Sequence, residues 1–184
     1  MVSFIYHILS IVIQLYILVA VYYYCIKIYG IKATLISNFC LSSLVLTLIF
    51  TGTYSAADLE FAPFAKMKIG DTQFGFSDPV TIFTFFVVIF ELARFSLRKT
   101  KGMYLSIKNI IKISIVVTIY GILFQLLIDS TAAALGLYYY RNPPPINIFG
   151  FPIWFITSFG IYGLYAFVFL LFERYYMKRN IEPA

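Results

Sequence analysis

Charged side chains are scarce in this sequence. Of its 184 residues only 12% are charged, whereas 61% are hydrophobic and the mean hydropathy is +0.89. A soluble domain averages about 25% charged residues, with which it covers its surface. The composition therefore excludes an ordinary soluble domain and predicts an integral membrane protein of the all-α class, a polytopic helical bundle.

The residues and motifs of several common chemistries are missing too. The chain has one histidine, His7, and two cysteines, Cys25 and Cys40, which we expect to be small buried residues because their spacing is not that of metal ligands. It contains no Gly-x-Ser-x-Gly elbow, phosphate-binding Gly-Lys loop, His-Glu-x-x-His motif or Asp-Asp-x-x-Asp pair. We therefore expect no metal and no cofactor, and we disfavour nucleotide and diphosphate chemistry.

Long apolar runs are abundant. A helix needs about 20 apolar residues to cross the hydrocarbon core of a bilayer. Five runs approach or exceed this length, at about residues 4–26, 35–56, 79–97, 109–134 and 149–172. Pro79 opens the third run, a position where its missing N–H costs little. The expected fold is one transmembrane domain over residues 1–184 with about five spans in the cell membrane.

The basic residues give this bundle an orientation. The net charge is +6, but the charges lie at the ends of apolar runs, where lipid headgroups are their natural neighbours, so we expect no nucleic-acid partner. Eleven of the 14 Lys and Arg residues fall on one side of a five-span bundle: Lys27, Lys32, Arg94, Arg98, Lys99, Lys101, Lys108, Lys112, Arg174, Lys178 and Arg179. The positive-inside rule then places the C-terminus in the cytoplasm and the N-terminus outside.

Two segments place charged side chains where a transmembrane bundle has few of them. Glu91 and Arg94 are three residues apart near the basic end of the third run, and we expect them to pair as a structural anchor. The longest loop, residues 57–78, holds Asp58 and Glu60 on the expected outer side. It either lies in the headgroup region or folds over the bundle as a lid.

An acidic residue at the end of the fourth run is the main candidate for function. Ionisable side chains near hydrocarbon are costly, so Asp129 is read first as a functional group. Gln125 lies four residues before it and Gly121 four before that, which puts all three on one helical face. Such a face suits protein or a cavity better than lipid. The alternative is a single structural hydrogen bond between packed helices.

Carboxylates and aromatic rings suit a long apolar ligand handled without a cofactor. A protonated carboxylic acid, here Asp129, can deliver a proton to a carbon–carbon double bond. Aromatic faces stabilise the carbocation that results, and water then adds to it. The catalytic candidates are Asp129, Asp58 and Glu60, and the ligand-binding candidates are Gln125, Tyr138, Tyr140, Pro152 and Trp154.

The segment from Asp129 to Phe159 also carries a family resemblance. Asp129, Leu135-Gly136, Tyr138 with Tyr140, and Phe149-Gly150-Phe-Pro152 follow the order Asp, Leu-Gly-aromatic-x-aromatic, aromatic-Gly-x-Pro. This segment resembles the membrane proteins of carotenoid biosynthesis that include the carotenoid hydratases. The resemblance implies a cofactor-independent hydro-lyase that acts on a carotenoid or another isoprenoid. After the proline the chain departs from the family, which continues with Asn-Phe and Gly-Trp.

Two other functions remain open at this stage. A non-catalytic accessory subunit of a larger membrane complex, or a homo-oligomer, is expected to present small residues such as Ser158, Gly160 and Gly163 to a partner helix. A small-solute transporter is the weaker alternative, since no helix broken by Gly or Pro recurs at matched positions in the two halves. Membrane lipid is an expected partner in every case.

Overall fold

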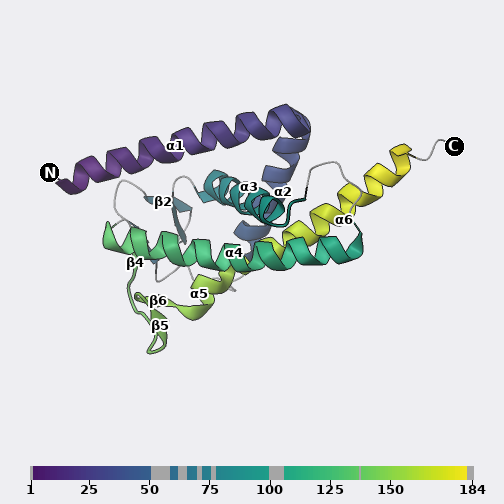
Figure 1. Ribbon diagram of the computed structural model, residues 1–184. Coiled ribbons are helices and arrows are strands. Elements are labelled where there is room, and N and C mark those ends of the chain that lie inside the picture. The colour runs from purple at the N-terminus through teal and green to yellow at the C-terminus, as the bar shows by residue number, and fades with distance from the viewer. Residues whose placement is uncertain are drawn as a thin grey trace. The chain divides into compact units, whose positions relative to one another are not determined.

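The computed structural model describes residues 2–50, 59–61, 66–69, 72–75, 78–99, 106–136 and 138–181. Most of these residues are helical (Figure 1). The helices are α1 (Val2–Tyr29), α2 (Ile31–Phe50), α3 (Asp78–Ser96), α4 (Ile107–Ala134), α5 (Ile153–Thr157) and α6 (Ile161–Ile181), with a 3₁₀ turn, η3 (Ser158–Gly160), before the last. The strands are β1 (Leu59–Phe61), β2 (Lys66–Ile69), β3 (Thr72–Gly75), β4 (Tyr138–Tyr140), β5 (Asn147–Ile148) and β6 (Phe151–Pro152).

The chain divides into two compact units. Unit 1 consists of Met1–Phe85 and Leu127–Phe155, and unit 2 consists of Phe86–Leu126 and Ile156–Ala184. The prediction of a single transmembrane domain over residues 1–184 remains a prediction.

In unit 1 the first two helices meet at a single residue, Gly30. Its φ of +83° is one that a side chain disfavours, and nothing else separates Tyr29 from Ile31. The carbonyl of Gly30 accepts hydrogen bonds from both the amide and the hydroxyl of Thr34, which start α2 without a loop. Figure 1 shows the resulting sharp corner between α1 and α2. The second helix therefore begins at Ile31, four residues earlier than predicted.

Three small antiparallel sheets complete unit 1. β1 pairs with β4, β2 with β3, and β5 with β6. The strands are two to four residues long, and the sequence analysis predicted none of them. β1 and β4 come from segments far apart in the chain, so their pairing ties the stretch before α3 to the stretch after α4.

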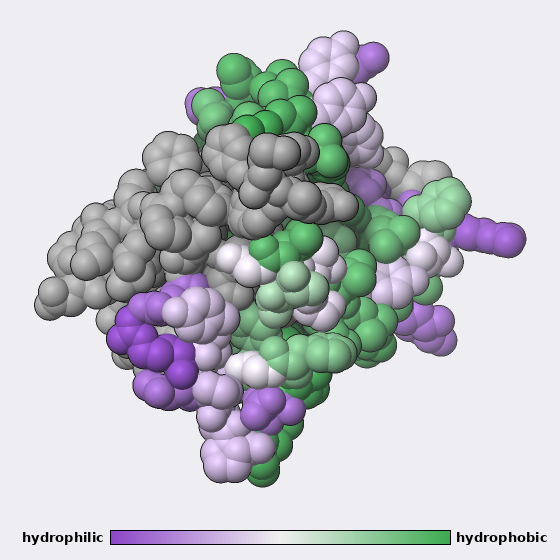
Figure 2. All heavy atoms as spheres, turned by 90° about the vertical axis from the view of Figure 1, so that its left-hand side faces the viewer, coloured by the Kyte–Doolittle hydropathy of each residue, from purple (hydrophilic) through white to green (hydrophobic). Residues whose placement is uncertain are grey.

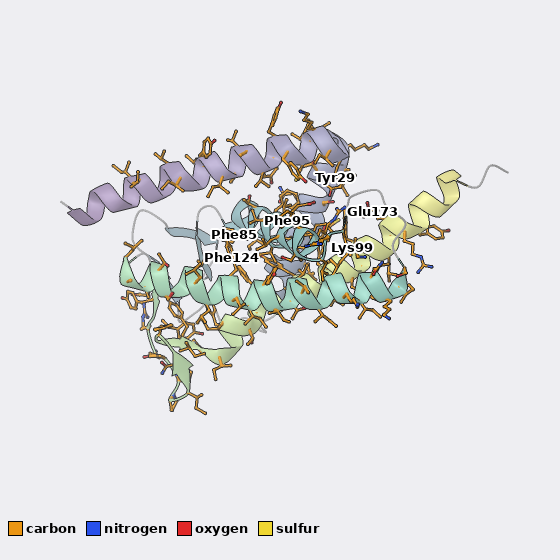
Figure 3. All side chains as sticks on the ribbon, in the orientation of Figure 1. Tyr29, Phe85, Phe95, Lys99, Phe124 and Glu173 are labelled. Carbon is orange, nitrogen blue, oxygen red and sulfur yellow. The ribbon has the colours of Figure 1, made fainter. Side chains whose placement is uncertain are left out.

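Unit 2 is held together by aromatic side chains. The ring of Phe86 on α3 lies edge-on to Tyr165 on α6 with 4.7 Å between ring centroids, and Phe90 meets Phe169 in the same way at 5.8 Å. From the first pair to the second, the position advances by four residues on each helix, so one face of α3 packs along one face of α6. Figure 3 labels Phe124 on α4 and Glu173 on α6, two half-buried side chains of this unit.

Helices α4 and α6 approach each other where both carry small residues. A Cβ placed on Gly163 would lie 2.7 Å from the backbone oxygen of Ser114 and 1.8 Å from Oγ1 of Thr118. A Cβ on Gly121 would lie 2.5 Å from the backbone oxygen of Phe159. Glycine is therefore required at both positions, because small residues let helix backbones come close.

The predicted pair of Glu91 and Arg94 is confirmed. An Nη1 atom of Arg94 lies 3.6 Å from Oε1 of Glu91, and its guanidinium carbon lies 5.4 Å from the centre of the Phe90 ring. The Arg94 side chain is only 3% exposed, so it packs inside the unit and does not reach outward as a snorkelling side chain would. A buried guanidinium is tolerated only with charge and ring partners of this kind.

Helix α3 ends in a Schellman motif built around an arginine. The amide of Lys99 donates to the carbonyl of Arg94, and the amide of Arg98 donates to that of Phe95, both at 2.8 Å. Arg98 takes the left-handed position with a φ of 52°, where glycine is the usual residue.

We expect Arg98→Gly to stabilise the protein by about 0.5–1 kcal/mol, because glycine adopts a left-handed φ without the Cβ penalty. The shift in thermal unfolding midpoint in detergent measures this effect. Arg98→Ala is the matched control, since it removes the charge and keeps the Cβ. A similar gain from both variants would assign the effect to the charge and not to the backbone.

The outer surfaces of the helices are apolar. On α4 the exposed positions repeat every four residues: Ile107, Ile111, Ile115, Ile119, Leu123 and Leu127. The opposite face of α4 buries Ile110, Ile113 and Val117 completely. Figure 2 shows hydrophobic side chains, in green, at the surface over much of the face that it draws. A helix that is apolar on both its packed and its exposed faces is typical of a membrane span.

Two helical stretches among the described residues are long and apolar enough to cross a membrane, Ile107–Ile128 and Phe155–Tyr175. They match the predicted fourth and fifth spans, and α3 matches the bounds of the third to within one residue. The predicted start of the fifth span at Phe149 is wrong: residues 147–152 form the β5–β6 hairpin, and the helix begins at Ile153. Residues 51–56 of the predicted second span lie outside the described residues. Five spans and their orientation remain a prediction.

The two cysteines differ in environment. Neither forms a disulfide bond within the described part of the chain, and Cys25 on α1 is buried as expected. Cys40 on α2 is exposed, so the expectation of a buried residue is wrong there.

Candidate functional site

The β1–β4 ribbon brings Glu60 next to the segment that follows α4. Glu60 lies directly opposite Tyr139, with Leu59 opposite Tyr140 and Phe61 opposite Tyr138. Residues in register on an antiparallel pair project to the same face, and that face alternates along each strand. Glu60, Tyr139 and Arg141 therefore share one side of the ribbon.

These three residues form a clasp across the ribbon. The hydroxyl of Tyr139 donates to Oε2 of Glu60, and Nη2 of Arg141 donates to Oε1 of the same carboxylate. Arg141 and Glu60 are 56% and 25% exposed, so the clasp lies at the surface. With both oxygens engaged by donors, Glu60 is suited to hold or orient a neighbouring group and is poorly suited to give up a proton.

The clasp also changes the acidity of Tyr139. Its hydrogen bond to Glu60, followed by the repulsion between phenolate and carboxylate, raises the pKa of Tyr139, while Arg141 opposes the rise. The folded value therefore lies above the ordinary tyrosine pKa of about 10. The stabilisation is present below that ordinary pKa and is lost as pH rises through the folded value.

We expect Glu60→Gln to lower the pKa of Tyr139, because it removes the carboxylate that raises it. Ultraviolet difference absorbance during an alkaline titration measures the change, with each protein referred to its own Tyr139→Phe derivative so that the remaining tyrosines cancel. Arg141→Gln is the matched control and should move the pKa upward. A Tyr139 titration unaffected by Glu60→Gln would contradict the clasp.

Beneath the ribbon lies a buried aromatic cluster. Tyr140 is 8% exposed and its ring meets Phe155 at 6.1 Å, while Phe155 stacks on Phe151 at 5.5 Å. Pro152 is also buried and pairs with Asn147 in the hairpin. Two of the predicted ligand-binding residues, Tyr140 and Pro152, thus belong to one packed region of unit 1.

Asp129 lies in the last turns of α4, where the chain turns toward this ribbon. The helix ends at Ala134, and Gly136 reverses the chain with a φ of +65° before β4 begins. The hydroxyls of Ser130 and Thr131 both donate to the carbonyl of Leu127, so these side chains bond back to the helix. Asp129, Gly136 and the β4 tyrosines are therefore close together along the chain and belong to unit 1.

Not every predicted site residue joins this region. Gln125 is on α4 one helical turn before Asp129, is only 3% exposed and belongs to unit 2. Asp58 lies outside the described residues. Trp154 lies on α5 and Tyr138 on β4.

Sequence reasoning missed the two partners of Glu60. Neither Arg141 nor Tyr139 was among the predicted site residues, although Tyr138 and Tyr140 on either side of Tyr139 were. The local signal for both was the two-residue alternation of Tyr139 and Arg141, which places them on one face of a strand. Their link to Glu60 comes from pairing with β1, which lies some eighty residues earlier in the chain.

Two glycines of the last span, Gly160 and Gly163, pack against α4 of the same chain. Gly160 packs with ordinary contacts against Thr118 and Ile122, and Gly163 is buried against Ser114 and Thr118. Because α4 covers these two glycines, they are not exposed for packing against another protein. Within the described part of the chain no group of three or more His, Cys, Asp or Glu side chains is placed to hold a metal ion.

Searches of protein families, curated proteins and solved structures found no match to this chain.

Proposed function

We propose that this protein is a membrane-embedded hydratase that binds an isoprenoid or similar apolar chain and adds water to one of its double bonds. In the proposed topology the N-terminus is outside, the C-terminus is cytoplasmic, and the β1–β4 ribbon lies at the outer end of α4. The ribbon is the observation that supports the proposal. It ties a charged and hydrogen-bonded clasp to a buried aromatic cluster, beside the helix end that bears Asp129.

Each part has a role in the proposed reaction. Protonated Asp129 gives its proton to one carbon of the double bond, and the other carbon becomes a carbocation. Aromatic rings of the cluster, including Tyr140, stabilise that cation through their faces. Water adds to the cation and then returns a proton to the Asp129 carboxylate, so the net change is the addition of one water molecule. Glu60, with Asp58, would orient the reacting groups.

Mass spectrometry of lipids and pigments that co-purify with the protein tests the proposal. Membranes containing the full chain would be solubilised mildly, and the bound molecules compared for the native protein and for Asp129→Asn. We expect an isoprenoid in both samples and its hydrated form only in the native one, because asparagine cannot donate the proton.

Ser130→Ala controls for general effects of changing this helix end, and its bound molecules should match those of the native protein. Bulk membrane lipid alone, identical in all three samples, would contradict the hydratase proposal. That result would favour the non-catalytic subunit, whose partner would then have to use a surface other than the Gly160 and Gly163 face.

A further inference from the structure

The β5–β6 hairpin ends in an apolar tip formed by Ile146, Ile148 and Phe149. Their side chains are 73%, 36% and 68% exposed. Phe151 and Pro152, which follow Gly150, are buried and anchor the hairpin to the aromatic cluster of unit 1. Figure 1 shows the hairpin projecting beyond β4. The hairpin is therefore held on one side and presents hydrophobic side chains on the other.

Phe149 occupies an unfavourable backbone position at this tip. It has a φ of 51° and Gly150 follows with a φ of 83°, as in the two-residue turns where both central residues are left-handed. Asn, Asp or Gly is preferred at the first of these positions, and a side chain like that of Phe costs about 1–2 kcal/mol there. Strained residues of this kind mark places where the side chain itself is needed.

Several backbone polar groups of the tip are hydrogen-bonded within the hairpin. The side chain of Asn147 donates to the carbonyl of Pro144 at 2.8 Å and accepts from the amide of Gly150 at 3.1 Å. Ile148 pairs with Phe151 across the hairpin, and the three prolines before it, Pro143 to Pro145, have no N–H. A segment satisfied in this way can leave water at little cost.

The sequence around the tip places it next to a membrane span. No Asp, Glu, Lys, Arg or His occurs from Asn142 to Phe172. The candidate span Phe155–Tyr175 begins six residues after Phe149, so the tip can be no more than about 20 Å from the start of the span. The headgroup region is roughly 5–7 Å thick on each side of the hydrocarbon, so the tip is within reach of the bilayer surface. Phe and aliphatic side chains that reach this surface bury at the boundary between headgroups and acyl chains.

From these observations we propose that the tip inserts into the bilayer at the boundary between headgroups and acyl chains. Its ligand is the lipid surface, and burial of Phe149 there offsets the strain of the turn. The insertion fixes the depth of the β5–β6 hairpin and of the aromatic cluster to which it is anchored. This inference needs only the membrane location and is independent of the hydration reaction.

Lipid quenching of tryptophan fluorescence tests the insertion. With Trp154→Phe as background, a single probe is introduced as Phe149→Trp or as Ile146→Trp, and the full chain is reconstituted in phosphatidylcholine vesicles. The lipids carry bromine on the upper acyl chain, and iodide is the quencher in water. We expect bromine to remove most of the emission of either tip probe and iodide to have little effect.

Asn142→Trp is the matched control, because this exposed position lies at the base of the hairpin beside the charged Arg141. Its emission should respond to iodide much more than to bromine. Two results would overturn the proposal. Strong iodide quenching of both tip probes would place the tip in water, and protection from both quenchers would mean that a protein partner or a second copy covers it. Position 146 does not have a left-handed backbone, so Ile146→Trp adds no backbone strain there. This probe can still be measured if Phe149→Trp folds poorly.

Discussion

Replacing Gly163 with alanine is expected to destabilise unit 2 by about 3 kcal/mol, the upper end of the usual cost of overpacking. The added methyl group would lie 2.7 Å from the backbone oxygen of Ser114 and 1.8 Å from Oγ1 of Thr118. Thr118 can rotate, but its hydroxyl would then lose its 3.0 Å hydrogen bond to the same Ser114 carbonyl. The backbone oxygen itself moves only if α4 and α6 separate. The change in thermal or denaturant-induced unfolding in detergent measures the loss.

Gly160→Ala is the matched control for this prediction. Its new methyl group would find no atom closer than the Cγ2 of Thr118 at 3.5 Å, an ordinary contact, so little change in stability is expected. Gly121→Ala should resemble Gly163→Ala, since its methyl group would meet the backbone oxygen of Phe159 at 2.5 Å. Equal stability of the Gly160 and Gly163 variants would contradict the close approach of the two helices.

The long helices were predictable because they depend on sustained local patterns. Apolar runs with polar or basic ends indicated α3 and α4 to within about two residues, and Pro79 indicated where α3 starts. The first two apolar runs were predicted to be separated by residues 27–34, a longer break than the single residue Gly30 of the structure. One left-handed glycine is enough to separate two helices.

The strands were not predictable from the same patterns. They are at most four residues long, too short for an alternation of polar and apolar residues to stand out. At the β5–β6 hairpin, Phe149 occupies the turn position where asparagine or aspartate would have predicted a hairpin. Its apolar neighbours looked instead like the start of a span. The turn was therefore hidden by the residues that make its tip hydrophobic.

The candidate site was predictable only in part, for a related reason. Counting charges at helix ends predicts one side of the membrane for Glu60 and for the segment after α4. These two segments pair as β1 and β4, while their side of the membrane remains a prediction. Which side chains meet Glu60 depends on the register of β1 against β4, and no local pattern encodes a register between distant segments. Tyr139 and Arg141 were therefore missed, although both lie within the stretch that drew attention to Asp129.

The proposed reaction predicts that Asp129→Asn slows hydration by about 10²–10⁴-fold, the usual contribution of a general acid. Asparagine keeps the size and polarity of the side chain but has no acidic proton to give. In proteoliposomes supplied with an isoprenoid in heavy water, the native protein should place a deuteron on carbon along with the new hydroxyl. The rate should fall as pH rises, because only the protonated carboxyl group donates.

Two further variants separate catalysis from folding. Asp129→Glu keeps the acid and should retain a measurable rate, while Ser130→Ala changes the adjacent residue and should leave the rate unchanged. Glu60→Gln should reduce the rate less than Asp129→Asn, since a carboxylate held by Tyr139 and Arg141 orients groups and does not supply the proton. If Asp129→Asn keeps full activity, the proton must come from another group, and the end of α4 loses its catalytic role whatever the ligand proves to be.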